Sequence, residues 1–164
     1  MSDSGRLLDR TRHVCVIGAG SSGLAAAKNF TEAGFEVDVL EECADLGGNW
    51  NYDSPTARVY RSTHTISSKP GTEYTDYPMP NSYSDYPHHE KVLDYLRGYA
   101  DHLDLGRLIE YKMVVERVKR ASEPGGIGPS GERCWDVWLA GGQVRRYGAL
   151  VIANGHNNEP RHPE

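Results

Sequence analysis

Apolar residues fall in short runs along this chain, and their spacing separates the predicted strands from the predicted helices. The run HVCVI at 13–17 is typical of a buried strand, and EVDVL at 36–40 alternates as a half-buried strand does. Between them, the Ala-rich stretch 22–34 favours a helix that ends at Gly34, because glycine suits the residue after a helix. Residues 13–40 therefore predict a strand–helix–strand unit.

The rest of the chain predicts one more helix and further strands. After Pro87, the stretch 88–105 has a single apolar helical face. The residues of that face are Val92, Leu93, Leu96, Tyr99, Ala100 and Leu103. Segments 108–120, 134–140 and 143–155 have strand patterns, with Gly141 and Gly142 as a hairpin turn. Residues 44–87 show no sustained period, and a long irregular segment in a compact domain is usually functional.

These elements predict an α/β fold. We expect a mainly parallel, doubly wound Rossmann-type sheet, with an antiparallel meander from 108 to 147 laid on it. Residues 1–12 are expected to form a disordered lead and residues 13–164 a single domain.

Composition narrows the function classes. A formal net charge of −5 argues against nucleic acid or an anionic membrane as partner, and no apolar run approaches the ~18 residues needed to span a bilayer. Cys15, Cys43 and Cys134 show no metal-ligand spacing, and the N-terminus lacks the apolar core of a signal peptide. A cytoplasmic protein with a small-molecule substrate and no metal site is the simplest interpretation; the oligomeric state stays open.

The first candidate binding site lies at the turn after the first predicted strand. Gly18, Gly20 and Gly23 spell G-x-G-x-x-G, with Ala19, Ser21 and Ser22 between them. The first glycine permits a tight turn, the second lets a pyrophosphate approach the backbone, and the third lets the helix pack close to the sheet. The N–H groups at the start of the helix then face the phosphates.

A second match to the same pattern tests how specific the first one is. Gly126, Gly128 and Gly131 have the same spacing, but no strand pattern precedes them and no helical pattern follows. We interpret them as a flexible loop. The first motif has both flanking elements and also has Glu41 at the end of the next strand, where a carboxylate can bind ribose hydroxyls and would repel a 2′-phosphate. FAD and NAD share this ADP half, so these residues leave the choice between them open.

Further motifs resemble a known family. EECADLGGNW at 41–50 places Gly47 and Gly48 six and seven residues after Glu41, with Trp50 behind them. Together with YRSTHTISSK at 60–69, YPMP at 77–80 and VIANGH at 151–156, it strongly resembles the flavin-containing monooxygenases and their Baeyer–Villiger and N-hydroxylating relatives. The resemblance implies that FAD binds the first glycine motif and that NADPH binds an inserted second domain. It also implies oxygenation of a soft nucleophile, such as an amine or sulfide, or of a ketone.

The resemblance also implies contacts for individual residues. The turn from Gly18 to Ser22 would hold the FAD pyrophosphate, Glu41 the adenosine ribose, and the backbone of Val115 the adenine. The second glycine turn would flank the flavin through Gly48, Asn49 and Trp50. The residues expected near the isoalloxazine and the nicotinamide are Thr65, Ile66 and Ser67.

Two departures from the family pattern limit these expectations. Ile66 stands where animal members usually carry Asn, and isoleucine has no hydrogen-bonding group to offer beside the flavin. The sequence also has no second phosphate-binding unit, so it resembles the N-terminal part of such an enzyme, and we expect no catalysis from it alone. The alternatives are a non-catalytic nucleotide-binding fragment and another flavoprotein with two dinucleotide domains, such as a disulfide reductase, although Cys43 lacks the redox partner of that group.

Overall fold

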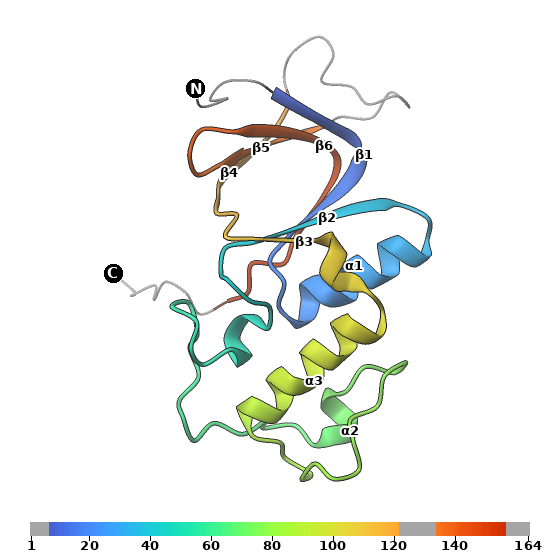
Figure 1. The fold of residues 1–164 in the computed structure, drawn as a ribbon, viewed down its shortest axis with the longest axis vertical. Helices are drawn as coiled ribbons and strands as arrows, with labels where there is room; N and C mark the ends of the chain where they lie inside the picture. Colours follow the sequence, from blue (N-terminus) through green and yellow to red (C-terminus); the bar gives the residue numbers. More distant parts are fainter. Residues whose placement is uncertain (1–6, 122–133, 157–164) are drawn as a thin grey trace, which may run out of the picture.

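The computed structural model describes residues 7–121 and 134–156, which form a six-stranded mixed sheet with helices (Figure 1). The strand order is β3-β2-β1-β6-β5-β4. The strands are β1 (Leu7–Ile17), β2 (Glu36–Glu41), β3 (Ile109–Tyr111), β4 (Val115–Arg120), β5 (Trp135–Leu139) and β6 (Val144–Ile152). The helices are α1 (Ser21–Glu32), α2 (Lys69–Thr72) and α3 (His89–His102), with short 3₁₀ turns η1 (Gly48–Trp50) and η2 (Leu105–Leu108). The α/β class predicted from the sequence is confirmed.

The predicted strand–helix–strand unit is present as β1, α1 and β2. The two strands are parallel, with Val14 opposite Val37 and Val16 opposite Val39. Gly34, with φ of +86°, follows the end of α1, as the sequence predicted. Because β3, β2, β1 and β6 are all parallel, their carboxyl ends meet at one edge of the sheet. Ligands bind at this edge in open α/β sheets.

The expectation of a disordered lead through residue 12 was wrong for residues 7–12. β1 begins at Leu7, and its first residues pair with β6 from Val144 onward. The pairing register shifts between Arg10 and Val14. Gly148 lies opposite this irregularity, and a Cβ there would come within 2.2 Å of the Thr11 carbonyl oxygen. The bulge hides the strand from pattern analysis, because it breaks the period of two.

The segment 108–120 is two strands rather than one, so the predicted meander begins later. Lys112 lies between them with φ of +59°, which ends the extended conformation. β3 pairs in parallel with β2, whereas β4, β5 and β6 form the antiparallel meander. The turn between β5 and β6 is made by Gly141 and Gly142, both with positive φ, as predicted.

Two apolar clusters lie on opposite faces of the parallel strands. On one face, α1 and α3 pack against alternate strand residues, among them Val14, Val16 and Val39. On the other face, Cys15 and Leu40 pack against residues of the meander. The meander, in place of a helix, therefore covers the second face within the described ranges. Burial raises the pKa of the Cys15 thiol to about 12, so it is a neutral core group.

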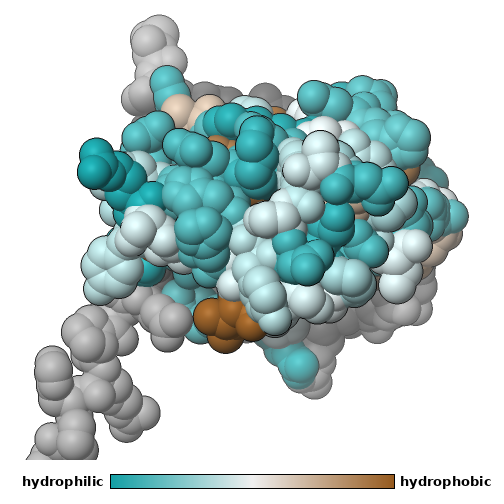
Figure 2. All heavy atoms as spheres, turned by 90° about the horizontal axis from the view of Figure 1, so that it is seen from below, coloured by the Kyte–Doolittle hydropathy of each residue, from teal (hydrophilic) through white to brown (hydrophobic). Residues whose placement is uncertain are grey.

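The segment between β2 and α3 is irregular, as expected, and is mostly polar at its surface. The end of the molecule that carries α2 and the start of α3 is hydrophilic over most of its area (Figure 2). The apolar face predicted for 88–105 is confirmed, since Val92, Leu96 and Tyr99 are at most 2% exposed. None of the helices in 7–121 and 134–156 is long and apolar enough to cross a bilayer.

Candidate functional site

The turn between β1 and α1 needs glycine at two positions for reasons internal to the protein. Gly18 has φ of +100°, and a Cβ there would lie 2.6 Å from the Ala153 carbonyl oxygen. A Cβ on Gly23 would lie 1.9 Å from the Gly18 carbonyl oxygen. No side chain fits these gaps, because main-chain atoms fill them. The first and third glycines of the motif therefore set the tight turn and the close helix–strand packing, as predicted.

Gly20, the middle glycine, differs from both. Its φ of −78° and ψ of −172° suit any residue. A Cβ there would meet only Gly48 among the described residues, at an ordinary 3.6 Å from its Cα. Folding alone therefore does not require glycine at this position. A ligand lying against the backbone would require it.

The second glycine turn meets the first. The Gly47 N–H donates to the Ala19 carbonyl at 3.0 Å, and Gly48 lies against Gly20. Gly47 and Gly48 have φ of +112° and +53°, the left-handed region that glycine tolerates best. Two turns separated by more than twenty residues in the sequence thus form one backbone surface.

Glu41, at the end of β2, joins the first glycine turn to the start of the segment that carries the second. Its side chain is only 5% exposed. The Ala19 N–H donates to Oε2 at 2.6 Å, and the Cys43 N–H donates to Oε1 at 2.9 Å. Each carboxylate oxygen can accept a further hydrogen bond. Glu41 therefore organises the turn as well as offering acceptors; that it binds a ribose stays a prediction.

The start of α1 supplies donors. Ser21 and Ser22 are exposed in its first turn, and in the described chain no side chain caps this end. The Leu24 N–H bonds to the Gly20 carbonyl at 3.0 Å, so the earlier N–H groups of the helix have no main-chain partner of this kind. These donors and the helix dipole suit an anion beside Gly20.

Val115 lies beside the Glu41 end of the sheet, as the predicted adenine contact requires. The Met113 N–H donates to the Glu41 carbonyl at 2.8 Å, and β4 begins two residues later at Val115. That its backbone contacts an adenine stays a prediction.

The residues predicted beside the flavin are spread more widely. Asn49 and Trp50 follow Gly48 in η1; the Asn49 side-chain oxygen accepts from the Arg58 N–H at 3.0 Å, and Trp50 packs partly against the core. Trp50 therefore has a structural role as well.

The loop 65–67 is held by the start of α3. The Thr65 N–H donates to the Pro87 carbonyl at 3.0 Å. Its hydroxyl is buried, with no partner among the described residues, whereas Ile66 is 99% exposed and Ser67 is exposed. No hydrogen bond recorded for the described residues joins these three to the glycine turns, so their proximity to a flavin stays a prediction. The second glycine motif, at 126–131, lies outside the described residues.

Sequence analysis missed one residue of this site. The Tyr74 hydroxyl donates to the Ser21 carbonyl at 2.6 Å, which ties the irregular segment to the first turn of α1. Burial raises the pKa of Tyr74 above its ordinary value, so the hydroxyl remains a donor. The Tyr74 ring also packs against the ring of Tyr99, with centroids 4.2 Å apart and planes inclined by 33°. No local pattern could reveal a partner 53 residues away.

Comparisons with known proteins agree with this geometry. The profile of the family described as flavin-binding monooxygenase-like matches residues 11–164. The dimethylaniline monooxygenase [N-oxide-forming] 2 of Rattus norvegicus is 33% identical over an alignment of 159 residues that covers 93% of this chain and 29% of the relative. The chain thus spans less than a third of that relative's length.

Solved structures resemble the fold closely. The S-allyl-L-cysteine S-oxygenase from Allium sativum matches with a TM-score of 0.76 and 27% identity, covering 94% of this chain and 38% of that one. A steroid monooxygenase bound to NADP matches with a TM-score of 0.72 and 26% identity, covering 92% of this chain and 27% of that one. From its sequence profile and these relatives, the chain belongs to the flavin-binding monooxygenase-like family.

Proposed function

We propose that this chain binds FAD along the carboxyl edge of its sheet. In this proposal it forms the FAD-binding portion of a flavin-dependent, NADPH-consuming monooxygenase. The observation that carries the proposal is the environment of Gly20. Backbone conformation and neighbouring atoms permit a side chain there, yet the position lies between free helix N–H groups and the second glycine turn. A pyrophosphate lying against Gly20 accounts for the glycine.

The residues present fit the ADP half of FAD. The N–H groups at the start of α1 would donate to the pyrophosphate, with Gly20 and Gly48 leaving room for it. Glu41 would accept from ribose hydroxyls through the free lone pairs of both carboxylate oxygens, while the Ala19 and Cys43 N–H groups hold the carboxylate in place. The backbone at Val115 would meet the adenine.

The flavin end would extend past η1. Bound FAD supplies the redox chemistry of the family, namely acceptance of hydride and activation of O₂. The chain's own part is to hold and orient: Asn49 and Trp50 would flank the ring, and the unpartnered Thr65 hydroxyl is a group that a ligand could satisfy. Ile66, being 99% exposed and apolar, offers no hydrogen bond there.

The substrate class is a soft nitrogen or sulfur nucleophile, or a ketone. An N-oxide-forming and an S-oxygenating relative support the first part of this proposal, and a relative bound to NADP supports NADPH as the reductant. The same residues would equally serve a chain that holds FAD without catalysing a reaction, which is the alternative function.

Gly20→Ala tests the proposed pyrophosphate site directly. FAD is titrated into the parent chain and the variant, and binding is followed by quenching of flavin fluorescence. Removing good phosphate contacts should lower the affinity at least about tenfold, a loss of about 1.4 kcal/mol or more. The unfolding free energy of the variant without FAD should stay within about 1 kcal/mol of the parent, because the added methyl meets only an ordinary contact.

Gly106→Ala is the matched control. A Cβ at Gly106 meets no described atom within 4 Å, and this glycine lies in η2, outside the two glycine turns. Its FAD affinity should equal that of the parent. Equal affinities for Gly20→Ala and the parent, or no FAD binding by the parent, would overturn the proposal.

A further inference from the structure

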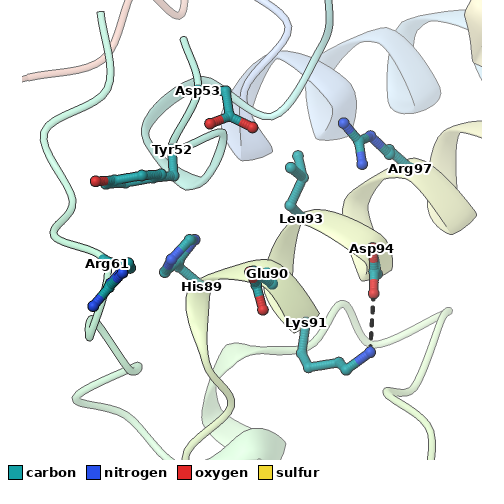
Figure 3. Close-up of a pocket in the computed structure, with 9 residues that line it drawn as sticks. All are labelled: Tyr52, Asp53, Arg61, His89, Glu90, Lys91, Leu93, Asp94 and Arg97. Atoms are coloured by element: carbon teal, nitrogen blue, oxygen red, sulfur yellow. Dashed lines mark hydrogen bonds and ion pairs between the residues drawn. The ribbon is translucent and has the colours of Figure 1, made fainter.

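A cleft of about 540 Å³ lies between the first turns of α3 and the segment that follows η1 (Figure 3). No residue of the two glycine turns lines it, although Leu93, which does line it, lies next to Gly47. A Cβ on Gly47 would come within 2.4 Å of Cδ1 of Leu93, which lines the cleft. The size is within the range of small-molecule sites. No residue predicted to contact FAD lines it.

His89 is the unusual group in this cleft. It is only 2% exposed, and neither of its ring nitrogens has a hydrogen-bond partner in the part of the chain that the structure describes. Its ring lies 5.4 Å from that of Tyr52, centroid to centroid. A buried polar group without a partner costs folding free energy, so a native one points to a missing partner. A ligand in the cleft would provide it.

The charges lining the cleft divide into paired and unpaired groups. Lys91 donates to Asp94 at 3.1 Å, Arg97 pairs with Asp45, and Glu90 lies 3.4 Å from the His88 ring.

Two charges remain. The side chains of Arg61 and Asp53 form no ion pair or hydrogen bond with any described residue. Figure 3 shows Arg61 and Asp53 on different sides of the His89 ring. An exposed cation and an exposed anion that have no partner among the described residues suit a ligand that carries both charges.

We propose that the cleft binds a small zwitterion, an α-amino carboxylate with an apolar side chain. The carboxylate would accept from the Arg61 guanidinium and from a ring N–H of His89. The ammonium would donate to Asp53. The apolar chain would lie against Tyr52 and Leu93, which supply the cleft's aromatic and aliphatic surface. This site is independent of the proposed flavin site.

Three related probes test the proposal. L-Norleucine has both charges, hexanoate lacks the amine, and pentylamine lacks the carboxylate. Each is titrated into the 164-residue chain without FAD, and the side-chain resonances of its histidines are followed by NMR. We expect L-norleucine to shift the His89 resonances with a dissociation constant on the order of 1 mM. Each single-charge probe should bind at least about tenfold more weakly, because one charge-assisted contact is lost.

Variants locate the site. Arg61→Gln and Asp53→Asn, both at exposed positions, should each lower the affinity for L-norleucine about tenfold or more. Lys91→Gln alters a lining charge that already has a partner, so it should change the affinity for L-norleucine less than about twofold. Equal binding of hexanoate and L-norleucine would show a simple anion site and overturn the proposal. The proposal would also be overturned if L-norleucine, at a concentration of roughly ten times the expected dissociation constant, caused no shift of the His89 resonances.

Discussion

The strand–helix–strand unit at 7–41 and the irregular segment at 42–88 each contribute one glycine turn to the candidate site, but they are held in different ways. In the first, a continuous parallel ladder joins β1 and β2. Gly23 then brings α1 against the turn so closely that main-chain atoms leave no room for a methyl. The geometry of this unit is set by its own backbone.

The irregular segment has only scattered main-chain hydrogen bonds, and side chains that bond to main-chain groups add to them. The Tyr95 hydroxyl accepts from the Tyr74 N–H at 2.7 Å and donates to the Tyr77 carbonyl at 2.6 Å. Glu73 accepts from the Met79 N–H at 2.7 Å. These bonds replace the ladder that the segment lacks, because buried backbone groups need partners.

The two regions should therefore respond differently to a single substitution. A backbone-determined turn fails when one added atom clashes, because no rotamer change can relieve it. A segment held by many separate side-chain bonds loses about one bond per substitution, each worth ~0.5–1.5 kcal/mol.

Gly23→Ala should have the largest effect. Its Cβ would sit 1.9 Å from the Gly18 carbonyl oxygen, so α1 or the turn must move. We expect the unfolding free energy to fall by more than about 3 kcal/mol, measured by urea denaturation. Gly106→Ala, which adds a methyl in open space, should change it by less than about 1 kcal/mol. Similar small losses for both variants would contradict a backbone-determined turn.

The same difference explains what the sequence could predict. The strand–helix–strand unit, its three glycines and Glu41 were predictable because local spacing specifies a turn of this kind. The hairpin at Gly141–Gly142 was predictable for the same reason. The first residues of β1 were not, since their pairing depends on a bulge against Gly148 far along the chain. Nor was the break at Lys112, where a residue without special propensity adopts a positive φ.

Glu41→Gln should have the next largest effect, because Glu41 joins the two regions. A glutamine keeps one acceptor but turns an amide N–H₂ toward one of the two main-chain donors that Glu41 now satisfies. We expect the unfolding free energy without FAD to fall by about 1.5–3 kcal/mol. FAD affinity should fall about tenfold to a hundredfold, measured by fluorescence titration.

Glu42→Gln is the control for charge. Glu42 is the adjacent carboxylate in the chain and is exposed. It should leave both quantities near the parent values. If Glu41→Gln retained full FAD affinity while losing stability, Glu41 would organise the turn without binding the ribose.

The contacts of the irregular segment were beyond sequence analysis for a physical reason. Thr65 is tied to Pro87 and Tyr74 to Ser21, and each pair depends on how the whole segment folds back. Composition indicated only that the segment is long and rich in tyrosine. The structure explains the tyrosines, because a tyrosine ring packs in the core while its hydroxyl reaches a main-chain group.

Tyr74→Phe should have the smallest effect of the three, and it separates positioning from packing. The substitution keeps the ring that packs against Tyr99 and removes only the hydroxyl that donates to the Ser21 carbonyl at 2.6 Å. We expect a loss of about 1 kcal/mol in unfolding free energy, because one hydrogen bond is lost and the ring contacts stay. FAD affinity should fall by a few-fold at most, since the first turn of α1 keeps its main-chain bonds. Tyr60→Phe is the control, because Tyr60 is 81% exposed and its hydroxyl bonds to no described residue. A loss above about 3 kcal/mol in unfolding free energy for Tyr74→Phe would mean that the segment behaves as one cooperative unit and not as a set of separate bonds.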